Sequence, residues 1–212
     1  LEDFFGSVSG NRVRGVLRSV GLAPDVASAI TAMTVVNNQL PQGAPTSPIL
    51  ANMVSYRLDR ELMAFAGQHR LRYTRYADDI TLSGYAIPAG LFVAPPATTG
   101  RLLPDQLSPE LRQIIEGNGF RMNPAKIWYA DRTGRKEVTG LVVNEFTNVR
   151  RTFVRNLRAA LYRTQTLGVD AASAEFSAKL GGDASLEKVL RGRLEWLAQV
   201  RGRSFPPYRK YA

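Results

Sequence analysis

Apolar residues recur every three or four positions through the first seventy residues, a spacing that predicts amphipathic helices. One helix should end at Gly21, and another should begin at Pro24, because proline suits a first helical turn. A longer helix should follow Ser47 as its N-cap, begin at Pro48 and end near Gly67. The residues expected on the buried faces are Val13, Val16, Leu17, Val20, Val26, Ile30, Met33, Leu50, Val54, Leu58 and Leu62.

The pattern then changes to short runs of β-branched and aromatic residues, which predict strands at residues 71–75 and 80–83 joined as a hairpin. Further strands are expected at residues 127–129 and 138–143, where they close a small sheet. A helix opened by Ser108 and Pro109 should precede them. The Pro- and Gly-rich stretch 84–107 between the hairpin and this helix is expected to be a surface loop.

From Phe146 onward strand signals vanish and helical spacing returns, so we expect two domains, residues 1–145 and 146–212. The second should be helical, interrupted at Gly181-Gly182, with a last helix over residues 185–200. Arginines expected on the exposed sides of these helices are Arg150, Arg151, Arg155, Arg158, Arg191, Arg193 and Arg201.

The composition is that of a soluble globular protein, with 44% hydrophobic and 22% charged residues among 212, and no apolar run is long enough for a bilayer. The absence of cysteine excludes disulfides and thiolate metal sites and fits a reducing cytosol, and a single histidine argues against histidine chemistry. The net charge is +10, and residues 146–212 hold thirteen Lys or Arg against five Asp or Glu, a net of +8. This concentration of positive charge indicates a polyanion as partner.

The adjacent carboxylates of Asp78 and Asp79 fall at the tip of the expected hairpin. Two anions so close repel each other unless a cation lies between them, and their hard oxygens suit Mg²⁺. The chemistry this favours is metal-assisted phosphoryl or nucleotidyl transfer. The polar turn around Gly43, ahead of a helix N-terminus, suits a phosphate or base pair, although by itself this stretch favours a plain capped loop.

Several motifs occur in a telling order: Phe4-Phe5, residues 42–48, Tyr76-Ala77-Asp78-Asp79, Lys126, then a strand and a basic helical tail. This order resembles the palm of a reverse transcriptase followed by its thumb, and most closely the retron reverse transcriptases of bacteria. Residues 73–83, the triplet Val138-Thr139-Gly140 and residues 1–8 carry the resemblance. It implies an α+β fold, with a palm of a small antiparallel sheet packed on helices and an α-helical thumb.

The resemblance also implies roles for individual residues. Asp78 and Asp79 would be catalytic metal ligands, helped by the backbone carbonyl of Leu1, and Phe5 would be the aromatic gate against the nucleotide sugar, whereas Phe4 should be core. The residues implied to contact the incoming deoxynucleotide are Phe5, Gln42, Gly43 and Lys126, the last at the leaving pyrophosphate. Those implied to contact primer and template are Tyr76, Val138, Thr139, Gly140, Arg150, Arg151, Arg155, Arg158, Arg191 and Arg193.

The family's third metal-binding Asp and its fingers would precede Leu1, so the resemblance implies a portion of a larger enzyme that does not polymerise alone. It implies two Mg²⁺ ions, with Mn²⁺ as substitute, and as partners dNTPs, a structured noncoding RNA, an RNA–DNA duplex and an effector protein. No membrane is expected, and the location implied is the bacterial cytoplasm. A group II intron maturase is a second hypothesis, disfavoured by Val138-Thr139-Gly140. A non-catalytic RNA-binding scaffold is a third, disfavoured by the intact Asp78-Asp79 pair.

Overall fold

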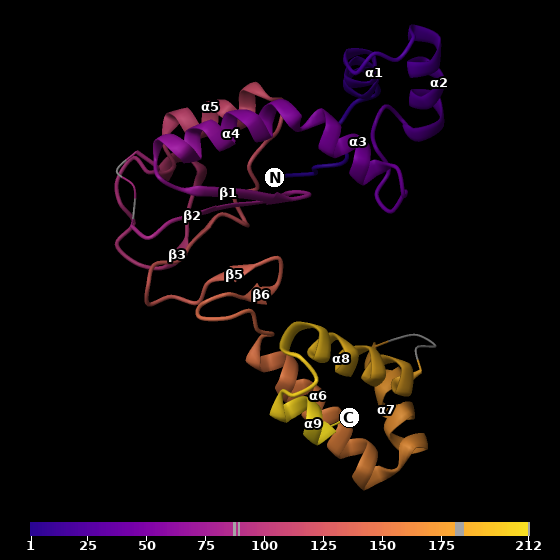
Figure 1. The fold of residues 1–212 in the computed structure, drawn as a ribbon. Coiled ribbons are helices and arrows are strands. Elements are labelled where there is room, and N and C mark those ends of the chain that lie inside the picture. The colour runs from indigo at the N-terminus through magenta and orange to yellow at the C-terminus, as the bar shows by residue number, and fades with distance from the viewer. Residues whose placement is uncertain (87, 89, 181–184, 212) are drawn as a thin grey trace. The chain divides into compact units, whose positions relative to one another are not determined.

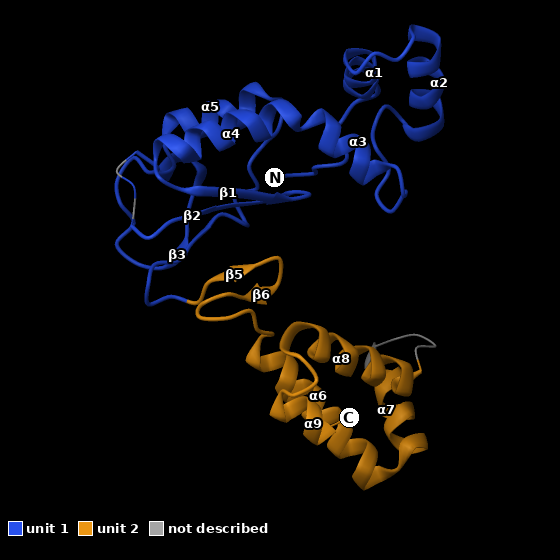
Figure 2. Ribbon diagram, viewed as in Figure 1, with its two compact units in different colours: residues 1–134 blue, residues 135–212 orange. Residues whose placement is uncertain are grey.

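The computed structural model describes the chain except residues 87, 89, 181–184 and 212 (Figure 1). It divides into two compact units, residues 1–134 and 135–212 (Figure 2). Helices predominate in both, and short antiparallel hairpins accompany them, which makes the fold α+β as expected. Within the described residues, no helix is both long and apolar enough to cross a bilayer.

The helices of the first unit fall where hydrophobic spacing predicts them. They are α1 (Gly10–Ser19), α2 (Pro24–Thr34), α3 (Ser47–Val54), α4 (Tyr56–Gln68) and α5 (Pro109–Gly117). The single long helix expected to end near Gly67 is divided at Ser55, but Leu50, Leu58 and Leu62 are buried as expected. Helix α4 packs against both α5 and strand β1 (Arg72–Tyr76), and α4 and α5 lie over the β1 hairpin in Figure 1.

The expected inner face of α2 is partly wrong. Val26 and Met33 are 45% and 77% exposed, whereas Ala27 is completely buried. A helix turns about 100° per residue, so Val26 lies about 100° and Met33 about 120° from Ala27 around the axis. Because the small Ala27 makes the buried contact, the larger residues face outward. Val20, just past the end of α1, is also exposed.

The described strands form three separate antiparallel pairs rather than one small sheet. Strand β1 pairs with β2 (Asp79–Ser83), which confirms the predicted hairpin. The other pairs are β3 (Gly100–Arg101) with β4 (Trp128–Tyr129), and β5 (Glu137–Val138) with β6 (Leu141–Val142). The single strand expected at residues 138–143 is wrong, because Thr139 and Gly140 both have positive φ, 48° and 83°, and turn the chain back as a two-residue hairpin loop.

The predicted surface loop at residues 84–107 is also partly wrong. Phe92, Leu102 and Leu107 are at most 8% exposed and belong to the core of the first unit. Backbone hydrogen bonds hold this segment down, including Leu102 N to Ile127 O at 3.0 Å. A single 3₁₀ turn, η1 (Pro104–Gln106), lies within it. Its apolar residues lack any regular period, so the pattern carries no sign of their burial.

The second unit contains α6 (Arg151–Leu167), α7 (Val169–Leu180), α8 (Leu186–Arg201) and α9 (Pro206–Tyr211), with the β5–β6 hairpin. Its core includes Leu157 and Leu197, both fully buried. Arg201, expected to be exposed, is half-buried, with its guanidinium over the rings of Phe146 and Phe205 at 4.1 and 4.5 Å.

The expected break at Gly181-Gly182 lies outside the described residues. The second unit begins at Arg135, and a functional boundary between residues 145 and 146 stays a prediction.

Replacing Leu157 by alanine should destabilise the protein by about 2–5 kcal/mol, because the change leaves a cavity in the core of the second unit. Leu167 on the same helix is 55% exposed and provides the matched control, for which the change should stay within about 0.5 kcal/mol. Chemical denaturation of both variants measures the free energy of unfolding. Equal losses in the two variants would contradict the described core.

Candidate active site

The tip of the β1–β2 hairpin is a tight two-residue turn. Tyr76 pairs with Asp79, so Ala77 and Asp78 form the turn itself. Ala77 has φ +51°, a left-handed conformation that a side chain disfavours. The turn leaves Asp78 half-buried and Asp79 exposed, while Tyr76 is 73% exposed. The two carboxylates therefore lie at an accessible edge of the first unit, as the sequence predicts.

Lys126 reaches this tip from a distant part of the chain. Its ammonium donates a hydrogen bond to Asp78 Oδ2 at 3.1 Å, although the two residues are 48 positions apart. An Asx turn presents the lysine, because Asn123 Oδ1 accepts from Ala125 N at 2.9 Å. The hydrogen bond to Asp78 raises the pKa of Lys126. A lysine at this position in the sequence could equally have been solvated, and the fold brings it to the carboxylate.

The first residues of the chain complete the tip. The nitrogen of Leu1 donates a hydrogen bond to the main-chain oxygen of Asp78 at 2.5 Å, and Glu2 N donates to Arg121 O at 2.8 Å. These bonds hold the backbone of Leu1, including the carbonyl predicted to contact a metal, beside the turn. Leu1, Asp78 and Lys126 thus meet at one place, with Asp79 next in the chain.

The two phenylalanines that follow divide as expected. Phe4 is buried in the core, 4% exposed, and stacks on Phe120 with ring centroids 5.6 Å apart. Phe5 is half-buried, and its ring meets Phe4 edge-on at 5.3 Å. Its packing against Phe4 fixes the ring of Phe5 while leaving part of it accessible, which a gate against a nucleotide sugar requires.

The loop before α3 is anchored differently from the prediction. Ser47 is not the N-cap: the helix begins at Ser47 itself, whose buried hydroxyl donates to Pro41 O at 2.7 Å. This bond fixes the turn that exposes Gln42 and Gly43. Gly43 has φ +86°, and a Cβ there would meet no atom within 4 Å, so its side of the turn is open. In the described part of the chain, no hydrogen bond or ion pair links Gln42 or Gly43 to the Asp78 turn.

The donor atoms at the hairpin tip suit a hard divalent cation. Asp78 and Asp79 supply carboxylate oxygens and the adjacent backbone supplies carbonyl oxygens, which are ligands that Mg²⁺ accepts. Among the described residues, no cluster of three or more His, Cys, Asp or Glu side chains could hold a metal. The residues present therefore fit part of a magnesium shell, and water and substrate phosphates commonly supply the rest.

Sequence reasoning missed the ion pair that supports this turn. Arg75, whose side chain is 6% exposed, forms an ion pair with Asp59 of α4 at 2.6 Å. The hydroxyl of Tyr73 donates to the same carboxylate at 2.6 Å. Burial and this bond raise the pKa of Tyr73, and the hydrogen bonds to Asp59 raise the pKa of Arg75. The arginine beside Tyr76-Ala77-Asp78-Asp79 was visible in the sequence, but nothing marked Asp59 as its partner.

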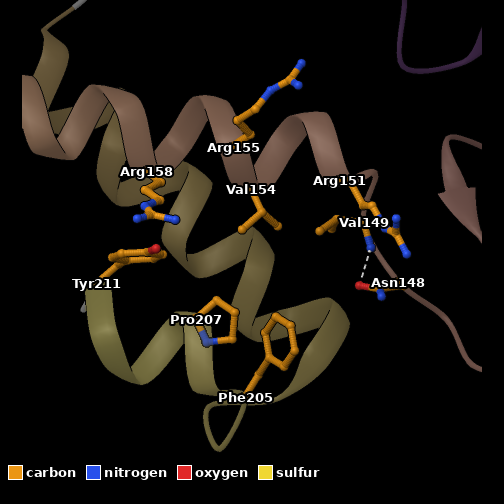
Figure 3. Close-up of a pocket in the computed structure, with 9 residues that line it drawn as sticks. All are labelled: Asn148, Val149, Arg151, Val154, Arg155, Arg158, Phe205, Pro207 and Tyr211. Atoms are coloured by element: carbon orange, nitrogen blue, oxygen red, sulfur yellow. Dashed lines mark hydrogen bonds between the residues drawn. The ribbon is translucent and has the colours of Figure 1, made fainter.

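The predicted nucleic-acid residues of the second unit are in different environments. Arg150 donates to Glu137 Oε1 through Nε at 2.7 Å, so its charge is already paired. Arg151, Arg155 and Arg158 of α6 are exposed and line a pocket of about 430 Å³. Figure 3 shows Arg158 pointing toward the ring of Tyr211, while Arg155 points away from it.

The remaining predicted contacts lie on a turn and on α8. Thr139 and Gly140 are exposed at the turn between β5 and β6, next to the half-buried Val138. On α8, Arg191 is exposed as expected, whereas Arg193, which was also expected to be exposed, is half-buried.

No family model matches the chain. The reverse transcriptase of retron Ec86 from Escherichia coli is 34% identical over 163 residues, which cover 76% of this chain and 47% of that protein. The reverse transcriptase of retron Mx162 from Myxococcus xanthus is 34% identical over 186 residues, covering 76% and 38%. That of retron Mx65 from Myxococcus xanthus is 32% identical over 181 residues, covering 77% and 39%.

These similarities place the chain among the reverse transcriptases. Within that class it belongs to the retron type, and it spans less than half the length of each of these three relatives. The predicted family is thereby confirmed.

Changing Lys126 to methionine should leave the free energy of unfolding within about 1 kcal/mol of wild type, because its pair with Asp78 is largely exposed. Removing this positive charge should also raise the affinity for Mn²⁺ by up to about fivefold. Thermal unfolding and Mn²⁺ titration measure the two effects. Lys188→Met, on the exposed side of α8, is the control, and an equal gain in that variant would contradict the contact.

Proposed function

We propose that this chain is part of an RNA-directed DNA polymerase that extends a primer hydroxyl with dNTPs on a structured noncoding RNA. The observation that carries the proposal is the hairpin tip, where Asp78 and Asp79 adjoin Lys126 and the backbone of Leu1. Its relatives are named reverse transcriptases of retrons, which favours this reading over an intron maturase. The accessible carboxylate pair favours it over a scaffold without turnover.

Asp78, Asp79 and the Leu1 carbonyl would hold Mg²⁺, or Mn²⁺ in its place. Two bound ions supply activation of the attacking hydroxyl and stabilisation of the charge that develops on the leaving oxygen. Lys126, already 3.1 Å from Asp78, is close enough to the same site to neutralise or protonate the departing pyrophosphate. A lysine is protonated at neutral pH, as this role requires.

Two further features would select and align the nucleotide. The half-buried ring of Phe5, held by Phe4, would clash with a 2′-hydroxyl and so favour deoxynucleotides. Gln42 and Gly43 would lie over the new base pair, where the open side of Gly43 permits close approach. Such positioning contributes much of the rate in nucleotidyl transfer.

In the second unit, the exposed turn at Val138-Thr139-Gly140 would contact the primer, and the arginines would contact duplex phosphates. The exposed side chains of Arg151, Arg155 and Arg158, the last of which points toward the ring of Tyr211, are suited to a nucleic-acid backbone. Contacts of this kind position the duplex without reading its sequence. The net charge of +8 over residues 146–212 supports the same assignment.

Asp78→Asn in the full-length enzyme should reduce DNA synthesis by at least about a hundredfold, since losing even an outer-shell partner of a metal costs about 10- to 100-fold. Its affinity for RNA that copurifies with the full-length enzyme should stay within about twofold of wild type, because Asp78 lies away from the arginine-rich unit in sequence. Primer extension and filter binding measure the two quantities. Asp105→Asn, an identical change at an exposed residue of η1, should retain synthesis. Undiminished synthesis by Asp78→Asn would refute the assignment.

Affinity for an RNA–DNA duplex should fall steeply as salt rises, because each phosphate contact releases counterions. The slope of log affinity against log salt is negative, and Arg158→Gln should make it shallower by about 0.7 to 0.9. Arg163 lies on the same helix but is paired with Glu175, so Arg163→Gln should change the slope less. Fluorescence anisotropy, measured between about 50 and 200 mM salt, provides the test. A flat salt dependence would argue against a phosphate-binding second unit.

A further inference from the structure

The guanidinium of Arg75 bonds to the turn that carries Asp78 and to two helices. Arg75 donates through Nε to Asp59 Oδ1 and through Nη2 to Asp59 Oδ2, both at 2.6 Å, as a two-point fork. Its remaining terminal nitrogen, Nη1, donates to the carbonyl of Ala77 at 3.1 Å and to Asn52 Oδ1 at 3.1 Å. One side chain therefore joins α3 and α4 to the residue immediately before Asp78.

The position of the guanidinium is itself fixed. The ring of Phe4 lies 5.5 Å from its central carbon, and the Tyr73 hydroxyl occupies the third donor place at the Asp59 carboxylate. The side chain of Arg75 is only 6% exposed, so water has limited access to its bonds with Asp59 and Ala77, whereas its bond to Asn52 is exposed. A planar group with bonds on both of its edges has almost no freedom to shift.

The turn needs such a support. Ala77 adopts φ +51°, a left-handed conformation that is unfavourable for a residue with a side chain. Such a conformation persists where surrounding contacts determine it. The bond from Arg75 to the Ala77 carbonyl is a contact of this kind, and it acts one peptide away from Asp78.

We infer that Arg75 is a positioning residue of the nucleotidyl-transfer site: anchored by Asp59, it holds the Ala77–Asp78 turn so that the carboxylates face the metal. This inference rests on the proposed function. Lysine cannot replace the arginine, because an ammonium on a flexible stem cannot grip Asp59 with two parallel bonds and hold Ala77 with a third in the same plane.

Arg75→Lys in the full-length protein tests the inference. The turnover number for primer extension should fall about 10- to 100-fold with KM for dNTP within about twofold, since misplaced metal ligands affect chemistry more than nucleotide binding. Mn²⁺ affinity, followed by the electron paramagnetic resonance of the free ion, should weaken about tenfold. Arg72→Lys is the matched control, an identical change at an exposed residue of the same strand, and should match wild type.

A second variant guards against misfolding. Asp59→Asn keeps the size of the anchor but leaves a single oxygen to accept from the guanidinium, so it should change turnover and Mn²⁺ affinity in the same direction. Because the two residues act as a unit, the double variant should lose little more than Arg75→Lys alone. Circular dichroism and thermal unfolding establish the folded fraction of each variant at the assay temperature.

Two outcomes overturn the inference: Arg75→Lys behaves like Arg72→Lys, or its losses only track the unfolded fraction in both variants. The failure of the proposed function has a different signature, because wild-type protein would then lack DNA synthesis altogether. Mn²⁺ binding would still report whether Arg75 positions the carboxylates in that case.

Discussion

The carboxylate of Asp59 organises the part of the molecule that the proposed chemistry needs. It accepts three hydrogen bonds of 2.6 Å, one from the Tyr73 hydroxyl and two from Arg75, and so joins helix α4 to strand β1. Partly buried charges are unfavourable unless they are paired. Any packing of β1 on α4 that separates Arg75 from Asp59 is therefore disfavoured. The ion pair thus favours this packing of β1 on α4. A shift of β1 by one residue would turn Arg75 away from Asp59 and displace the turn.

At the hairpin tip, by contrast, the interactions between neighbouring residues are unfavourable. Asp78 and Asp79 are adjacent anions on a turn that already contains a left-handed alanine, so local preferences act against this arrangement. The surrounding structure compensates through Arg75 below the turn, through Lys126 beside it and through the backbone bond from Leu1. Places where local and global preferences conflict are frequently functional sites. The conflict at Ala77–Asp78 is consistent with a site kept for its chemistry.

Periodicity predicted much of the fold, because it reports which face of an element is buried. The helices of the first unit follow from it directly, whereas the β1–β2 hairpin was predicted from β-branched and aromatic residues and the burial of Phe4 from the family resemblance. It failed where burial has no period, as at Phe92 in the loop, and where one small residue makes the contact, as at Ala27. The run at residues 138–143 reads as a strand in composition, and only the backbone conformation of Thr139 and Gly140 shows a hairpin.

For the candidate site, sequence supplied the chemical groups but not their supports. The contact of Lys126 with Asp78 spans 48 residues, and that of Arg75 with Asp59 spans 16, so no local pattern could reveal either. Long-range pairing of this kind depends on how helices and strands pack, which a single sequence does not encode in any simple period.

Arginine has at least three different environments in the second unit, although composition counts every one as basic. Arg201 lies over the rings of Phe146 and Phe205, and Arg150 is paired with Glu137, so both are engaged within the protein. Arg155 and Arg158 are exposed on α6. A phosphate backbone attracts unpaired, accessible charge most strongly, since a paired guanidinium must first lose its partner. A duplex would therefore meet fewer unpaired, accessible positive charges than the net charge indicates. Among the described helices, α6 is the most prominent source of such charges.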